Sequence, residues 1–139
     1  MSAQESIVLF LRFGELNHQH TGKQKNVKRK ICYTLFINHG SGGGRKEGAK
    51  INRLVEMSNI IDTDIYIHSH THLPAIVKKG FFRIDPRNNA TQKVDKLYVN
   101  TNSFLEYGGY ADSHEYTPSS IETPIIKLGG RVKKYSATL

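Results

Sequence analysis

Apolar residues dominate two separate segments in the first third of the chain. Residues 7–13 are apolar and rich in β-forming side chains, and in residues 30–38 isoleucine, tyrosine and leucine recur at every second position. This alternation is typical of a β-strand that presents one face to a core. We therefore expect two strands, paired antiparallel, with a long polar loop over residues 15–29 between them.

A helix is predicted near the middle of the chain. After Gly48 the apolar residues recur at helical spacing and the charged residues fall outside their stripe, with Ile51, Leu54, Val55 and Ile61 apolar and Lys50, Arg53 and Glu56 charged. We expect a helix over about 48–61 that packs on a sheet. The Asp-Thr-Asp sequence at 62–64 ends it, and residues 65–67 start another strand.

The rest of the chain predicts short strands joined by turns. Turn-forming residues occur at 85–89 and at Gly129 and Gly130, and the expected strands are 76–79, 81–84, 96–100, 124–128 and 132–135. The fold class is therefore α/β in the broad sense (α+β), with mixed and mostly antiparallel strands and one main helix. The length of 139 residues favours a single domain over residues 1–139.

Charge and cysteine content bear on the binding partners and the cellular compartment of the protein. The chain has 20 Lys and Arg against 12 Asp and Glu, and its net charge of +8 favours approach to polyanions or phosphorylated substrates. The single cysteine, Cys32, has no partner within the chain, which fits a reducing compartment. No signal peptide or membrane-spanning run is visible, so we expect a soluble, cytoplasmic protein without a membrane partner.

Three alternating histidines follow the strand at 65–67. In extended backbone His68, His70 and His72 would point the same way at the end of that strand. Neutral imidazole is a good ligand for zinc, manganese and iron. The pattern admits two interpretations, an exposed polar strand end or a metal site. His18 and His20 are also spaced like a ligand pair, but in a polar loop we interpret them as facing solvent.

Another histidine, His39, ends a different strand and precedes the glycine-rich turn 40–44, from which it could reach the same rim. The turn lacks the spacing and the final Lys-Ser/Thr of a P-loop, and it lacks a dinucleotide fingerprint. Arg45 and Lys46 follow it. They could contact a substrate phosphate or simply belong to a solvated loop. His114, in a polar stretch, is interpreted as part of a surface loop.

The order of these segments resembles the C-terminal half of a calcineurin-like metallophosphoesterase domain, a β-sandwich with flanking helices. The resemblance rests on Asn-His-Gly at 38–40, a helix, Ser-His-Thr-His at 69–72 and Asn-Thr-Asn-Ser at 100–103. The glycine-rich segment 40–44 and Gly-Ala-Lys-Ile-Asn at 48–52 further resemble the branch common in phage genomes. Two residues depart from the family pattern, because Ser69 and Asn102 stand where glycine is usual.

The resemblance implies roles for individual residues. His39 and His70 would bind one metal and His72 the other, and His68 would be at most a neighbour that does not bind metal directly. The family's N-terminal half contributes Asp-x-His, Gly-Asp and Gly-Asn-His-Asp/Glu blocks, and none of them stands ahead of His39 in this sequence, where the family pattern places them. The resemblance therefore covers nearly the whole chain but only about the latter half of the family domain.

The function that the resemblance implies is hydrolysis of a phosphomonoester or phosphodiester, including nucleotides or nucleic acid, at two divalent metal ions such as Mn, Zn or Fe. Because most metal ligands are missing, we expect weak or no activity from the isolated chain. We also expect uncovered apolar surface, which a companion chain carrying the N-terminal half or a second copy in a homo-oligomer would bury.

Two other hypotheses stay open at this stage. The first is a noncatalytic basic module that binds nucleic acid through the cations between Lys23 and Lys30. The second is a structural site in which His68, His70 and His72 hold a single metal ion. Loss of metal binding on replacement of His39 would exclude the second hypothesis.

Overall fold

The computed structural model describes residues 6–14, 31–40, 46–102, 120 and 122–139. Its helical elements are α1 (Glu47–Glu56) and the 3-10 turn η1 (Met57–Asn59). Its strands are β1 (Ser6–Phe13), β2 (Ile31–Asn38), β3 (Ile65–His68), β4 (Ala75–Asp85), β5 (Ala90–Asn100), β6 (Ile125–Leu128) and β7 (Tyr135–Thr138). The predicted mixture of strands with one main helix is confirmed.

Five strands form one mixed sheet in the order β1-β2-β3-β5-β4, and β6 and β7 form a separate antiparallel pair. The predicted antiparallel pairing of the first two strands is confirmed, with Leu9 opposite Leu35. The three central strands β2, β3 and β5 run parallel, because α1 and β4 provide the crossovers that parallel neighbours need. Their carboxyl ends consequently meet at one edge of the sheet.

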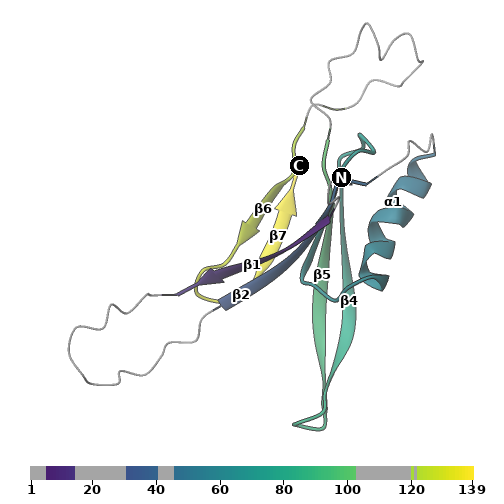
Figure 1. Cartoon of the computed structure of the whole chain (residues 1–139). Helices are drawn as coiled ribbons and strands as arrows, with labels where there is room; N and C mark the ends of the chain where they lie inside the picture. Colours follow the sequence, from purple (N-terminus) through teal and green to yellow (C-terminus); the bar gives the residue numbers. More distant parts are fainter. Residues whose placement is uncertain (1–5, 15–30, 41–45, 103–119, 121) are drawn as a thin grey trace, which may run out of the picture.

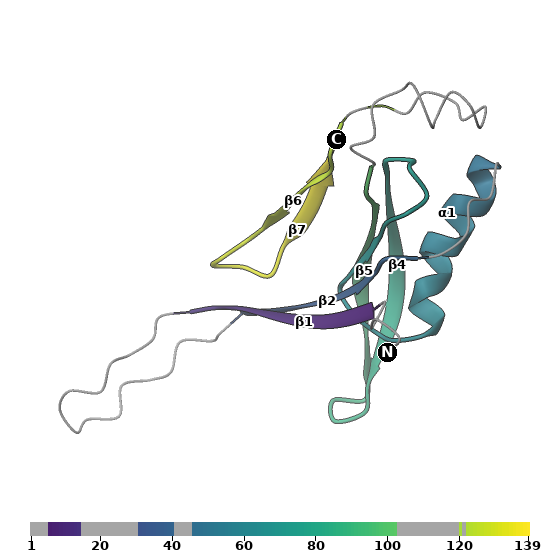
Figure 2. The same ribbon diagram turned by 45° about the horizontal axis from the view of Figure 1, so that its top comes forward.

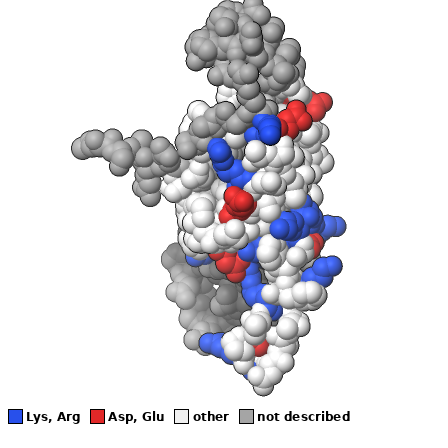
Figure 3. Space-filling view, turned by 90° about the vertical axis from the view of Figure 1, so that its right-hand side faces the viewer, with Lys and Arg blue, Asp and Glu red and all other residues white. Residues whose placement is uncertain are grey.

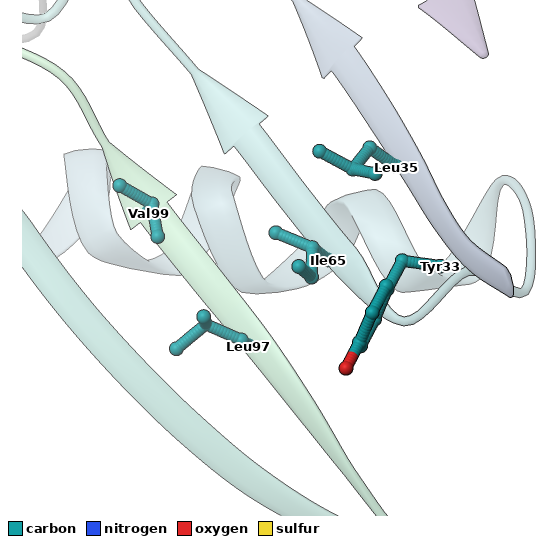
Figure 4. Close-up of a cluster of buried hydrophobic side chains, with 5 residues drawn as sticks. All are labelled: Tyr33, Leu35, Ile65, Leu97 and Val99. Atoms are coloured by element: carbon teal, nitrogen blue, oxygen red, sulfur yellow. The ribbon is translucent and has the colours of Figure 1, made fainter. Parts of the chain in front are cut away.

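One face of the sheet is covered by the β6–β7 hairpin. The sheet residues buried on this face are Tyr33, Leu35, Ile65, Leu97 and Val99, which project to the same side from three neighbouring strands (Figure 4). Hairpin residues such as Ile126 and Ala137 pack against this cluster. Figure 2 shows the hairpin on one side of the sheet and α1 on the other. The molecule therefore has three layers.

The opposite face is covered by α1, as the apolar stripe predicts (Figure 1). Leu54 and Met57 pack against Phe36, Tyr66 and Tyr98 of the sheet. The α-helix ends at Glu56 and a 3-10 turn continues to Asn59, so the predicted helix of 48–61 is a few residues too long. The tighter turn is accompanied by a hydrogen bond from the Ser58 hydroxyl to the Val55 carbonyl.

Asp64 fixes the register between β2 and β3. Its carboxylate accepts hydrogen bonds from the Thr34 backbone amide at 2.9 Å and from the Thr34 hydroxyl at 3.0 Å, and its own amide donates to the Thr34 carbonyl. Lys133 from the loop after β6 lies 2.8 Å from the same carboxylate. Because register determines which residues stand side by side, this contact also aligns the strand ends where the histidines lie.

Three strand predictions need correction. The strand expected at 96–100 begins six residues earlier, as Ala90–Asn100. Residues 76–79 and 81–84 belong to one strand, because Gly80 stays in the ladder opposite Asp95 rather than starting a turn. The last strand is Tyr135–Thr138 instead of 132–135. The residues before it loop around the Tyr33 hydroxyl, which donates to the Gly129 carbonyl and accepts from the Lys134 amide.

None of the helices in the described ranges has the length and apolar character needed to cross a membrane. The predicted loop at 15–29 and the polar stretch with His114 lie outside the described residues, as do residues 41–45 and Ser103.

Candidate metal centre

The candidate site lies at the carboxyl edge of the parallel strands. The register aligns Asn38 of β2, His68 of β3 and Asn100 of β5 in one row across the sheet. Each strand ends at that residue, so the chain that follows turns away from the sheet and carries its side chains to the rim. Ligand sites in sheets with parallel strands favour this edge, because loops from neighbouring strands converge there.

His39 and His70 come together at this rim. Both side chains are exposed, and their ring centroids lie 5.3 Å apart with the rings inclined at 68°. Two imidazoles on one tetrahedral ion, with metal–nitrogen bonds of about 2.1 Å, have centroids roughly 5 Å apart. The spacing is therefore compatible with two ligands of one ion, which is the role that the family resemblance implies for these two residues.

His72 stands slightly further away. Its ring centroid lies 6.2 Å from that of His70, which is wider than a shared tetrahedral ion allows. Among the described residues no three His, Cys, Asp or Glu side chains are arranged so that they could hold one ion. The described part of the chain thus offers a histidine pair and a separate histidine.

The backbone at these histidines differs from the sequence expectation. Strand β3 ends at His68, and His70 and His72 have φ angles of 68° and 53°, in the left-handed region. The idea that three alternating histidines share one strand face is therefore wrong. Histidine is one of the few residue types enriched in this conformation, so the turn is tolerated. Nor are His68, His70 and His72 grouped as three ligands of one ion.

His68 lies next to the three rim histidines, His39, His70 and His72, and is buried, with 2% of its surface exposed. Its Nδ1 lies 3.1 Å from Asn100 Oδ1. The Asn100 amide nitrogen donates to the Leu73 carbonyl at 2.6 Å, which orients the amide oxygen toward His68 and makes Nδ1 the protonated nitrogen. In this neutral tautomer Nε2 carries the lone pair, and it faces Gly40.

Asn100 holds the turn that carries His70 and His72. Besides His68 and Leu73, it donates a hydrogen bond to the Thr71 hydroxyl, so one amide joins β3, β5 and the turn. The Thr101 amide also donates to the His68 carbonyl at 2.8 Å. Sequence reasoning identified Asn100 only as the start of a later turn. A polar residue directly after the apolar run 97–99 was the signal for this structural role.

Gly40 permits the close approach of His39 to the rest of the site. It has a φ of 78°, and a Cβ built on it would lie 2.4 Å from His68 Nε2. Its amide donates to Asn38 Oδ1 at 2.6 Å, which turns the chain directly after His39. Only glycine combines this left-handed backbone with so little space.

The pKa values of two histidines are lowered, that of buried His68 and that of the more exposed His72. Desolvation lowers the pKa of His68, although its hydrogen bond to Asn100 partly opposes this, and the nearby Arg53 cation lowers it further. Desolvation is also the main cause of the lowered pKa of His72, with smaller contributions from His70 and Lys50. Both imidazoles are therefore favoured in the neutral form that metal ions require.

A cavity of about 460 Å³ opens beside the cluster, between the sheet and α1. Phe36 and Met57 form apolar parts of its lining, and Asn38, Arg53 and His68 form polar parts. Its volume falls in the range of small-molecule sites. Of the two cations considered for phosphate contact, Lys46 is exposed at the start of α1, whereas Arg45 lies outside the described residues.

Basic and acidic side chains alternate over the face that carries α1 and β4. Figure 3 shows lysines and arginines scattered there with acidic side chains between them. Arg83 and Lys96, for example, are both paired with Asp62, at 3.0 Å and 2.8 Å. This face therefore lacks the continuous basic stripe typical of nucleic-acid-binding surfaces.

Comparison with known proteins adds no family assignment. No family model, no curated protein and no solved structure matches the chain.

Proposed function

We propose that this chain carries one part of a two-metal phosphoesterase centre. The observation that supports this best is the pairing of His39 and His70. They end different segments of the sequence, yet their rings meet at the spacing of two ligands on one ion. His72 then serves the second ion, since its ring is too far from His70 to share the first.

Metal ions held by these histidines would supply Lewis-acid chemistry, activating water and offsetting the negative charge that develops on the phosphoryl oxygens. The residues of this chain supply neutral nitrogen donors and hold them in place. Gly40 allows His39 to approach, and Asn100 fixes the turn of His70 and His72 through Thr71 and Leu73. The favoured ions are Mn, Zn and Fe, which imidazole binds well.

Three imidazoles alone are a weak set of ligands for two dications. They carry no negative charge, so the positive charge of the ions stays largely uncompensated. The missing carboxylates come from a companion chain or from an additional N-terminal segment, and without them turnover is low or absent. The chain alone is therefore a binding-competent but catalytically incomplete unit.

The proposed substrate is a phosphate ester. The cavity beside His68 provides room for the organic part of the ester, and the net charge of +8 attracts the phosphate. Nucleotides and nucleic acids satisfy both requirements. The single cysteine, Cys32, is unpaired, which fits a reducing compartment, and nucleotide substrates occur in the cytoplasm. Both points favour a cytoplasmic location.

Metal-dependent cleavage of bis(p-nitrophenyl) phosphate tests the proposal. We expect little hydrolysis by the chain alone with Mn²⁺, and a rate increase on addition of a polypeptide that supplies the Asp-x-His, Gly-Asp and Gly-Asn-His blocks. His70→Ala should abolish that increase, whereas a matched His18→Ala/His20→Ala variant should retain it.

Two outcomes would contradict the proposal. The first is an increase that survives both His39→Ala and His70→Ala. The second is steeply salt-dependent binding of DNA or RNA that His70→Ala leaves unchanged, without any metal-dependent cleavage, because this would favour the noncatalytic nucleic-acid-binding module.

A further inference from the structure

Strand β1 forms an apolar edge of the five-stranded sheet (Figure 1). Its hydrogen-bonded neighbour in the sheet is β2, and no strand within the described ranges pairs with the backbone amides and carbonyls of its other edge. Five consecutive apolar side chains, from Ile7 to Leu11, are exposed, and the exposed fraction reaches 56% at Phe10. A long apolar strand with an open edge is a template for pairing with another strand.

Both faces of β1 are apolar. Leu9 and Leu11 lie opposite Leu35 and Tyr33, so they continue the layer that the β6–β7 hairpin covers. Phe10 alternates with them and continues the layer on the α1 side. A strand that pairs with this edge must therefore be apolar on both faces as well, which excludes the usual amphipathic strand with one polar face.

We propose that the partner of β1 is β1 of a second copy, paired antiparallel around a two-fold axis through Leu9. In this register Leu9 faces its own symmetry mate, Ile7 faces Leu11 of the second copy, and Val8 faces Phe10 of the second copy. Every central cross-strand pair is then apolar, and Arg12 lies opposite the small polar Ser6 of the second copy. The two sheets join into one continuous ten-stranded sheet.

Charge favours this orientation. Arg12 is the one charged residue of β1. Parallel pairing in register would place the two Arg12 side chains next to each other, whereas the antiparallel arrangement places them at opposite ends of the ladder. The contact is isologous and closes as a dimer, because each copy uses the same patch.

The opposite edge of the sheet, β4, is unsuited to the same contact. It also exposes large apolar side chains, among them Phe82 at 77%, but it carries Lys78, Lys79 and Arg83 along its length. Charged side chains repeated along an edge strand are a common protection against pairing with another edge, although Arg83 is here paired with Asp62 and Lys78 with Asp95. Strand β1 has no comparable protection among its described residues, and this selects β1 as the interface.

Disulfide cross-linking tests the register directly. In a Cys32→Ser background, Leu9→Cys places two thiols across the axis, where the Cα separation of about 4.5–5.5 Å permits a disulfide. We expect near-complete covalent dimer on mild oxidation. Ile7→Cys alone should stay monomeric on denaturing gels, whereas a mixture of Ile7→Cys and Leu11→Cys chains should cross-link.

Sedimentation of the otherwise unmodified chain tests the dimer itself. We expect a dimer that Leu9→Lys converts to monomer, since two ammonium groups would face each other across the axis. Phe82→Lys, the same type of replacement at an exposed apolar position of β4, should leave the dimer intact. A compact monomer at high concentration, a dimer that survives Leu9→Lys, or cross-linking of Ile7→Cys alone would overturn the proposal, and so would open-ended oligomers. None of these measurements depends on the metal centre.

Discussion

Replacing Gly40 by alanine tests the packing of the site most sharply. The added methyl carbon would lie 2.4 Å from His68 Nε2 and 2.7 Å from His68 Cε1, well inside van der Waals contact. His68 cannot easily retreat, because its ring is buried and its Nδ1 is bonded to Asn100. Alanine must also adopt the left-handed φ of 78°.

The expected loss of stability follows from these contacts. The left-handed backbone costs alanine about 1 kcal/mol. Displacing the His68 ring breaks its bond to Asn100, which costs about 1 kcal/mol, and up to about 2 kcal/mol more if a buried polar group is left unsatisfied. We therefore expect Gly40→Ala to lower the free energy of unfolding by about 2–4 kcal/mol.

Urea unfolding followed by circular dichroism measures this loss, and Gly48→Ala provides the matched control. A Cβ at Gly48 meets no atom within 4 Å, and the residue lies in α1, so the same substitution should stabilise the chain by about 0.5 kcal/mol. A Gly40→Ala variant as stable as the parent would refute the packing argument, because it would mean that His68 does not lie against Gly40.

Further predictions concern Asn100 and Tyr135. Asn100→Ala removes the hydrogen bonds to His68, Thr71 and Leu73. In the same urea assay it should lower the free energy of unfolding by about 2–4 kcal/mol. A loss below about 1 kcal/mol would exclude the structural role of Asn100. Burial raises the pKa of Tyr135 to about 12, and its hydroxyl donates to the Asp95 carbonyl. Because the folded chain holds this proton more tightly than the unfolded chain does, the resulting stability is complete below about pH 10 and is lost as pH rises toward 12. Tyr135→Phe should remove about 1–2 kcal/mol of this alkaline loss, and an unchanged slope of unfolding free energy against pH would contradict the assignment.

The sequence predicted the elements that depend on local patterns. Alternation in residues 30–38 identified β2, and the stripe through Leu54 identified α1, because periodic burial leaves a direct trace in the order of residue types. The break between β6 and β7 was placed correctly but the start of β7 was not. That boundary depends on the Tyr33 hydroxyl, which is distant in sequence and holds the loop backbone.

In the candidate site, too, some features were predictable from the local sequence and others depend on long-range contacts. The positions of His39, His70 and His72 at strand ends were predictable from the order of segments, whereas the left-handed backbone at His70 and His72 was not. The role of Asn100 depends on β5 lying next to β3, a long-range pairing that no local pattern encodes. His68 illustrates both cases, since it was expected beside the cluster, but its burial against Gly40 came only from the structure.

Metal titration of the histidine variants tests the central claim most directly. Isothermal titration with Zn²⁺ or Mn²⁺ should show binding by the parent chain that His39→Ala and His70→Ala each weaken on the order of 10-fold or more, corresponding to about 1.4 kcal/mol. The His18→Ala/His20→Ala variant should bind like the parent. Binding that is unchanged in both His39→Ala and His70→Ala would contradict the claim that this pair forms the metal centre.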